Sequence, residues 1–359
     1  MKSSPKRDPR RFPRFRSPLI AITVLLVGAL LWLDGCASSG AVRLEMGSER
    51  RTEVVWPPAP DPPRVRLIRT FTSAGDLGFR RSMIGRFVDF LRGGDRDEDL
   101  QHPYGIAVTA NEEIYVVDSS ARGVRVYDLP RGRRRFFTSD QLQNPVAVAV
   151  GQGGRIYVTD SEAGRVVVFD RSGETVASWG GLGRPTGIAV HPETGAIYVV
   201  DTDAHSVAVF DRDGNRTSTF GGRGSEFGRL NYPTLATVGP NGHVYVSDAL
   251  NFRVQVFTPD GEPVRTIGAL GDALGEFARP KGIGVDSQGR VYVVEGLYDV
   301  VNIFDPDGRL LLSFGGPGTA EGAFWLATGL AVDDRGRVFV GDGYNGRVQV
   351  FQMLDMVEP

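Results

Sequence analysis

The side chains that most often do chemistry are sparse in this chain of 359 residues. A thiol occurs once, at Cys36, and imidazoles occur four times, at His102, His191, His205 and His243. A single cysteine cannot form an internal disulfide, a haem attachment site or a multi-cysteine zinc site. No Gly-x-Ser-x-Gly motif is present, so the serine elbow of the α/β-hydrolases is excluded as well.

Carboxylates are the recurring candidates for a chemical role. Six acids each end a short run of β-branched and aromatic residues, at intervals of 41 to 47 residues: Asp118, Asp160, Asp201, Asp248, Glu295 and Asp342. A ring of carboxylates is one way to hold a cation. A residue that recurs once per repeat more often serves the repeat, by accepting backbone N–H groups and pairing with a nearby arginine. We therefore interpret the six acids as structural turn residues.

The acids are spaced by a repeat that occupies most of the chain. Each unit opens with a turn and a short apolar strand, as at 103–108, 185–190 and 280–285, and the acid ends the second strand. A third, alternating strand such as 347–351 and a fourth such as 310–314 complete the unit. Four strands in roughly 40–48 residues are one propeller blade.

Six such units predict an all-β, six-bladed β-propeller over residues 64–351. The sixth unit stops after its third strand, and the run 65–71 is the candidate for its missing fourth strand. Pairing the two chain ends in one blade closes the ring and removes open sheet edges. The stretch 75–100 interrupts the repeat, and its apolar residues at helical spacing predict one short helical insertion.

The repeat resembles that of the NHL family of β-propellers. The family pattern is Pro-x-Gly-hydrophobic-Ala-Val, a strand that ends in Asp, and then Asn-x-Arg-Val-x-Val-Phe. The second half of the pattern is complete in blades 4 and 6, in Asp248, Asn251 and Arg253 and in Asp342, Asn345 and Arg347. The resemblance implies a fold that hosts binding proteins and enzymes, among them zinc lyases with several histidines and lactonase-type enzymes with carboxylate-held calcium.

Strand directions divide the candidate residues between two faces. Turns before the first strand and after the second strand of each blade share one face, which we call the upper face. His102 and His205 then fall on the upper face and His191 and His243 on the lower, so three histidines do not converge on one metal. The candidate binding residues of the upper face are Tyr104, His205, Tyr232, Asn251, Tyr298, Trp325, Tyr344 and Asn345.

The first 36 residues have the pattern of an export signal. Basic residues between Lys2 and Arg16 precede an apolar run at 19–33, which at about 15 residues is shorter than a membrane-spanning helix. The run ends in Leu33-Asp34-Gly35-Cys36, which resembles the bacterial lipobox, with Asp34 as a departure from it.

The lipobox resemblance implies a lipoprotein signal peptide at 1–35, lipidation of Cys36 and delivery to the bacterial cell envelope, at the outer membrane. A proline-rich tether over 36–63 then separates the anchor from the propeller, and 352–359 form a C-terminal tail. Beyond residue 35 the chain has 34 basic and 41 acidic residues, which gives no electrostatic reason to bind nucleic acid.

The sequence therefore predicts a monomeric, lipid-anchored envelope propeller that binds a protein or a small ligand on its upper face, without catalysis and without a cofactor. The alternative is a calcium-dependent hydrolase or lyase of the lactonase-like kind. The two differ in whether carboxylates and amides that do not recur from blade to blade converge in the central channel.

Overall fold

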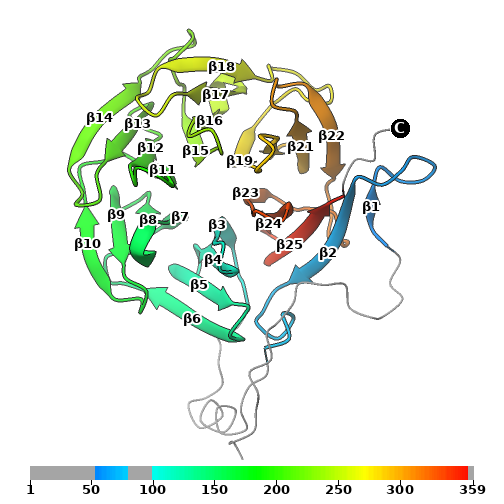
Figure 1. The fold of residues 1–359 in the computed structure, drawn as a ribbon, viewed down its shortest axis with the longest axis horizontal. Helices are drawn as coiled ribbons and strands as arrows, with labels where there is room; N and C mark the ends of the chain where they lie inside the picture. The colour runs from blue at the N-terminus through cyan, green and yellow to red at the C-terminus, as the bar shows by residue number, and fades with distance from the viewer. Residues whose placement is uncertain (1–52, 80–98, 355–359) are drawn as a thin grey trace, which may run out of the picture.

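The computed structural model describes residues 53–79 and 99–354. They form six antiparallel sheets around a central axis, five of four strands and one of five (Figure 1). In the four-stranded sheets, neighbouring strands are consecutive in the chain and run from an inner strand at the axis to an outer strand at the rim. The predicted all-β, six-bladed propeller is confirmed.

The first three blades follow one another along the chain. Blade 1 consists of β3 (Pro103–Val108), β4 (Glu113–Asp118), β5 (Gly123–Asp128) and β6 (Arg133–Thr138). Blade 2 consists of β7 (Pro145–Val150), the 3-10 turn η1 (Gln152–Gly154), β8 (Ile156–Asp160), β9 (Arg165–Phe169) and β10 (Thr175–Trp179). Blade 3 consists of β11 (Pro185–Val190), β12 (Ile197–Asp201), β13 (Ser206–Phe210) and β14 (Arg216–Gly221).

The last three blades have the same order. Blade 4 consists of β15 (Pro233–Val238), β16 (Val244–Asp248), the 3-10 turn η2 (Ala249–Asn251), β17 (Arg253–Phe257) and β18 (Pro263–Ile267). Blade 5 consists of β19 (Pro280–Val285), β20 (Val291–Glu295), β21 (Val300–Phe304) and β22 (Leu310–Gly315). Blade 6 takes from this end of the chain β23 (Ala327–Val332), β24 (Arg337–Asp342) and β25 (Arg347–Met353).

Blade 6 is closed by the N-terminal part of the domain, as predicted. β2 (Val65–Phe71) pairs antiparallel with β25, with Phe71 opposite Val348. A two-residue strand, β1 (Val55–Trp56), pairs with β2 as a fifth strand, which the sequence did not predict. Strands from both ends of the described chain therefore lie in one blade (Figure 1).

The last part of the expected tether belongs to the folded domain. Trp56 packs against Phe314 and Phe351, with ring centroids 5.7 Å apart in both pairs. The backbone N–H of Arg64 donates to the carbonyl of Trp56 at 2.7 Å, which closes the loop between them. The end of the tether predicted at 36–63 is thus held on blade 6 by the pairing of β1 and the packing of Trp56, while residues 58–63 are exposed.

Three sequence predictions fall outside the described residues. The signal peptide at 1–35 and the lipidation site Cys36 precede residue 53, and most of the predicted helical insertion at 75–100 falls on residues 80–98. The described start of that insertion forms a turn. Within residues 53–79 and 99–354, no helix is both long and apolar enough to cross a membrane.

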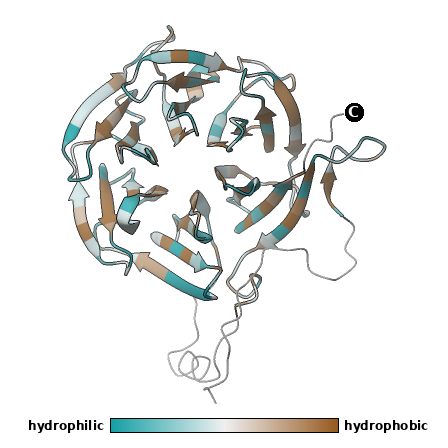
Figure 2. Cartoon of the chain, in the orientation of Figure 1, coloured by the Kyte–Doolittle hydropathy of each residue, from teal (hydrophilic) through white to brown (hydrophobic). Residues whose placement is uncertain are grey.

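The core lies between neighbouring blades. The second strand of each blade is buried on both faces, which explains its unbroken run of valine, isoleucine and tyrosine. Aromatic rings fill the space further out, as where Trp179 of blade 2 stacks on Phe210 of blade 3 at 5.6 Å. Figure 2 shows hydrophobic stretches on the middle strands, while outer strands such as β6 carry hydrophilic residues.

In blades 1 and 3 the inner strand approaches the next blade so closely that its third residue must be glycine. A Cβ atom on Gly105 of blade 1 would lie 2.6 Å from the Cα atom of Ala147 in blade 2. A Cβ atom on Gly187 of blade 3 would lie 2.8 Å from the Cα atom of Leu235 in blade 4. The glycine of the repeated Pro-x-Gly turn is therefore a packing residue.

Candidate functional site

The six repeated acids are buried at the upper ends of the second strands. Their carboxylates accept backbone N–H groups from the loop that precedes the first strand of the same blade. Asp118 accepts from Gln101 and His102 at 3.0 and 3.2 Å. Asp342 accepts from Trp325 at 2.7 Å. The acids thus fasten the loops of the upper face to one another.

In blades 4 and 6 the repeated asparagine and arginine complete this arrangement. The Nδ2 atom of Asn251 donates to Asp248 at 2.8 Å and to the carbonyl of Gly224 at 2.9 Å. The Nε atom of Arg253 donates to Asp248 at 2.9 Å, and Asn345 repeats the bonds of Asn251 in blade 6. The Nδ2 atoms of Asn251 and Asn345 thus donate within the fold, in contrast to the predicted role of both residues in ligand binding.

Blade 1 obtains the same ion pair from a residue that the repeat pattern does not indicate. Gly123 stands where blades 4 and 6 have arginine, but Arg125, two residues further along β5, lies on the same side of the strand. Its Nε atom donates to Asp118 at 3.1 Å, and both side chains are buried. The period of two along a strand is the signal that identifies Arg125.

The four histidines lie apart, and each ring has a partner nearby. His205 is buried, and its Nδ1 atom accepts the N–H of Tyr232 at 3.1 Å. The Nδ1 atom of His102 lies 2.7 Å from a serine hydroxyl, and His191 and His243 bond within hairpin loops of the lower face. In the described part of the chain, no three His, Cys, Asp or Glu side chains are grouped closely enough to hold a metal ion.

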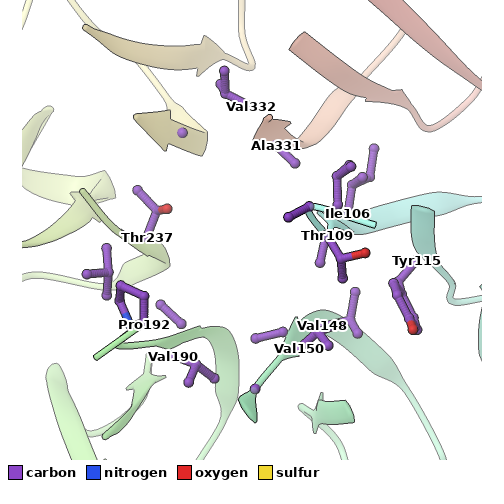
Figure 3. Close-up of a pocket in the computed structure, with 18 of the residues that line it drawn as sticks. Ile106, Thr109, Tyr115, Val148, Val150, Val190, Pro192, Thr237, Ala331 and Val332 are labelled. Carbon is purple, nitrogen blue, oxygen red and sulfur yellow. The ribbon is translucent and has the colours of Figure 1, made fainter. Parts of the chain in front are cut away.

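A cavity of about 710 Å³ opens at the lower end of the central channel (Figure 3). Each inner strand ends in a valine at this level: Val108, Val150, Val190, Val238, Val285 and Val332. The inner-strand residues that line the cavity are apolar, except for Thr237 and Gly284. The charged residues of the cavity, such as Glu113 and Asp286, come from other segments. The inner strands therefore contribute no ionised group to this end of the channel.

A polar pocket of about 490 Å³ opens on the upper face between blades 1, 2 and 3. Its polar lining residues are Tyr104, Ser119, Asn144, Ser161, Glu162, Arg184 and Thr186. Burial raises the pKa of Tyr104, and Arg184 acts in the opposite direction. The phenol therefore stays protonated at neutral pH and is a hydrogen-bond donor in this pocket. Of the predicted binding residues, Tyr104 is the one that lines it.

The charged residues of this pocket were not predicted from the sequence. The backbone N–H of Arg184 donates to Asp201 at 2.9 Å, which fixes the chain while the guanidinium stays half exposed, 3.7 Å from Asp203. Glu162 lies in the loop that follows Asp160. The available signal was the position of Glu162, where blades 4, 5 and 6 carry leucine or tyrosine. Arg184 gave no such signal, because blade 5 has Arg279 at the same position.

Lys281 is a further residue that sequence reasoning did not single out. It is the only lysine beyond Lys6, and it occupies the second position of inner strand β19, as Tyr104 does in β3. Its aliphatic stem lies over Gly296, whose Cβ atom would meet the Cδ atom of Lys281 at 2.7 Å. Burial lowers the pKa of its amine, and so does Arg279, against two nearby carboxylates that raise it.

Apart from Tyr104, the aromatic residues predicted for the upper face are exposed and gather on blades 4 to 6. The rings of Trp325 and Tyr344 meet edge to face with centroids 5.8 Å apart. Tyr232 packs on the ring of His205 at 4.5 Å, and Tyr298 is exposed in the loop of blade 5. The upper face thus has a polar pocket on one half and an apolar, aromatic surface on the other.

Comparison with known proteins identifies the repeat. The family model for the NHL repeat matches residues 142–169, 182–210, 230–257 and 324–351, which lie in blades 2, 3, 4 and 6. No curated protein matches the chain.

Solved structures share the fold at low identity. Virginiamycin B lyase from Staphylococcus aureus is 14% identical, with a TM-score of 0.54 over 71% of this chain and 96% of that one. A gluconolactonase from Xanthomonas campestris is 19% identical, with a TM-score of 0.55 over 71% and 87%. An auxiliary nutrient binding protein from Bacteroides thetaiotaomicron is 15% identical, with a TM-score of 0.58 over 71% and 70%. The chain thus contains four NHL repeats and folds as a six-bladed β-propeller.

Proposed function

We propose that the chain is a non-catalytic binding protein of the bacterial cell envelope that holds a polar ligand, or a polar segment of a protein partner, in the pocket between blades 1, 2 and 3. One contrast carries the proposal. The repeated acids, asparagines and arginines are used in bonds between loops, whereas Asn144 and Glu162 do not recur at their repeat positions and, with the half-exposed Arg184, line a pocket.

The chemistry of this pocket suits a small polar molecule with an anionic group. Arg184 offers planar N–H donors for a carboxylate or phosphate, and Glu162 accepts from hydroxyl or ammonium groups. Tyr104 adds a phenol donor on an apolar ring. Few convergent polar groups in a concave site are typical of ligand pockets. A nutrient-binding protein with the same fold gives a structural precedent, at 15% identity.

The predicted lipid anchor at Cys36 is the second part of the proposal. It is supported by the basic stretch, the apolar run and the lipobox-like end of the leader. Mass spectrometry of the N-terminal peptide of membrane-extracted protein tests it, because a diacylated or triacylated Cys36 has a distinctive mass. An unmodified Cys36 in an uncleaved chain would contradict it.

The alternative, a calcium-dependent hydrolase or lyase, has precedents of the same fold in a lyase and a gluconolactonase. It is less well supported because no three acidic, histidine or cysteine side chains converge within residues 53–79 and 99–354. Metal analysis of purified protein separates the two functions. Near-stoichiometric calcium or zinc that survives dialysis would favour the enzyme and would direct the search to lactone and ester substrates.

Ligand-dependent stabilisation tests the pocket. All blades and both closing strands lie in residues 53–354, so the chain from Ala37 onward retains the whole fold. Sugars, amino acids, nucleotides and sugar phosphates are added at millimolar concentration, and a bound ligand raises the unfolding temperature. Glu162→Gln with Arg184→Ala should abolish the rise. Arg171→Ala with Glu174→Gln, on the lower face, should keep it; loss in both variants would place the ligand elsewhere.

A further inference from the structure

One loop position divides the upper face into two halves. Two residues after the acid, blades 1, 2 and 3 carry polar residues: Ser120, Glu162 and Asp203. Blades 4, 5 and 6 carry Leu250, Leu297 and Tyr344 there, which are 50%, 54% and 55% exposed. Since polar residues serve three blades, the fold does not need an apolar side chain at this position. The three exposed apolar residues are therefore a feature of the surface.

Neighbouring loops extend the same surface. Leu274 is 76% exposed and Trp325 is 54% exposed, on the crossovers that lead into blades 5 and 6, and Tyr298 follows Leu297. The crossovers themselves are anchored by Phe277 and Phe324, which are fully buried. We name this surface the apolar arc, which consists of Leu250, Leu274, Leu297, Tyr298, Trp325 and Tyr344.

The N-terminal chain enters the propeller at the edge of the apolar arc. The carbonyl of Val54 accepts the N–H of Leu67 at 2.9 Å, beside β2. A Cβ atom on Gly322 would lie 2.8 Å from the Cγ1 atom of Val54 and 2.5 Å from the ring of Trp56. Gly322 belongs to the same upper-face crossover as Trp325. The preceding chain, which contains the predicted anchor, therefore joins the domain on the face that carries the arc.

We propose that the apolar arc docks on the lipid bilayer to which the chain is anchored, with Trp325, Tyr298 and Tyr344 at the headgroup level. This inference rests on the proposed lipid anchor for its setting. Sixteen residues lie between Cys36 and Glu53, a span of at most about 60 Å, so a lipid on Cys36 keeps the arc within reach of the leaflet that holds it.

The composition of the arc fits a lipid interface. Tryptophan and tyrosine favour the boundary between headgroups and acyl chains, where the ring is buried and its polar edge stays wet. The exposed charged residues on the crossovers of the arc, Asp272, Arg279 and Glu321, have both signs, so its binding should depend on apolar burial more than on anionic lipid. The polar half of the upper face, with its pocket, is lifted from the bilayer when the other half touches it.

Vesicle flotation tests the docking without the anchor. The chain from Ala37 onward is mixed with neutral phosphatidylcholine vesicles, and the fraction that floats gives a partition constant. The arc variant is Leu297→Ser, Trp325→Ser and Tyr344→Ser. The matched control is Phe136→Ser, Val176→Ser and Val264→Ser, which removes three exposed apolar residues from the outer strands. Near-ultraviolet circular dichroism and the unfolding temperature verify that both variants are folded.

We expect the unmodified chain and the control to float equally and the arc variant to bind at least tenfold more weakly. Tryptophan emission should also shift to the blue on vesicle addition, and Trp325→Phe should remove the shift, since Trp179 is buried and Trp56 packs on two phenylalanines. If the unsubstituted chain from Ala37 onward does not float, the docking is overturned, even if Cys36 proves to be lipidated in the full-length protein. If that chain floats while mass spectrometry finds Cys36 of the full-length protein without lipid, the docking is supported and the anchor is refuted. Equal flotation of the arc variant overturns the docking.

Discussion

The Oγ1 atom of Thr328 donates a hydrogen bond to the carbonyl oxygen of Pro103 at 2.9 Å, and this bond joins the inner strand of the last blade to that of the first, 225 residues earlier. Thr328 is buried, and its Oγ1 atom also lies 3.1 Å from the carbonyl oxygen of Gly341. The ring is thus closed at the axis as well as at the rim, where β2 pairs with β25.

Thr328→Val should lower the free energy of unfolding by about 1–3 kcal/mol, because it removes the donor from buried carbonyl groups while keeping the shape of the side chain. Urea denaturation followed by circular dichroism measures the change. Thr319→Val, on an exposed crossover, is the control and should stay within about 0.5 kcal/mol of the parent. Equal losses of unfolding free energy in both variants would mean that the bond to Pro103 does not stabilise the closed ring.

Gly105→Ala should be destabilising by about 1–3 kcal/mol, because its Cβ atom would meet the backbone of Val146 and Ala147 at 2.6 Å and push two blades apart. Gly180→Ala is the matched control, since nothing lies within 4 Å of a Cβ atom there. Thermal unfolding of the two variants side by side gives the comparison. Full stability of Gly105→Ala would mean that the inner strands can separate without cost.

Arg125→Leu should cost about 3–5 kcal/mol, because it leaves the buried carboxylate of Asp118 without its cation. Arg125→Gln should cost less. Glutamine occupies the equivalent position in blades 4 and 6, where Gln255 and Gln349 donate to the acid at 3.1 and 3.2 Å. Denaturant titration at pH 7 ranks the two variants, and the reverse order would contradict the ion-pair role.

Lys281 should make the stability of the propeller depend on pH. Its folded-state pKa lies below the ordinary 10.5, so the folded state is penalised wherever the unfolded chain binds the proton more tightly. Lys281→Met should therefore gain most stability below the folded-state pKa, and the gain should shrink as the pH rises towards about 10.5. Urea titrations from pH 7 to 10.5 test this, and a gain independent of pH would refute it.

The lowered pKa of Lys281 can also be measured directly. No other lysine occurs beyond Lys6, so an acylating reagent has one side-chain target in the chain from Ala37 onward. The pH dependence of the labelling rate, read from the mass of the Lys281 peptide, gives the pKa of its amine. A midpoint at or above 10.5 would contradict the effect of burial.

The repeat made the fold predictable. Each blade repeats one hydrophobic pattern, and the sixth blade lacks a strand that 65–71 supplies in the structure with the same bounds. β1 was not predicted because two residues before a proline have no periodicity. Arg125 was missed because it performs the task of a repeat residue from another position of the strand, and Arg184 because its role depends on which loops meet at the pocket.

The polar pocket and the apolar arc were only partly foreseen. Tyr298, Trp325 and Tyr344 were predicted from residue type, whereas Leu250 and Leu297 become informative only when the same loop position is compared around the ring. Asn251 and Asn345 belong to the repeated pattern, and their amides donate to the acids that hold the loops of their own blades. In a repeat protein, departures from the pattern mark the surface that differs between blades.

Closure of blade 6 also sets the order in which the protein can mature. β2 is synthesised before all strands of blades 1 to 5, yet its partner β25 is the last strand that the structure describes. Blades 1 to 5 can each form as a local sheet while the chain emerges, but β2 must wait with an unpaired edge until the final strand arrives. If the chain is exported from its N-terminus, as we propose, the strand with the unpaired edge and the predicted anchor are together at the membrane during the slowest stage of folding.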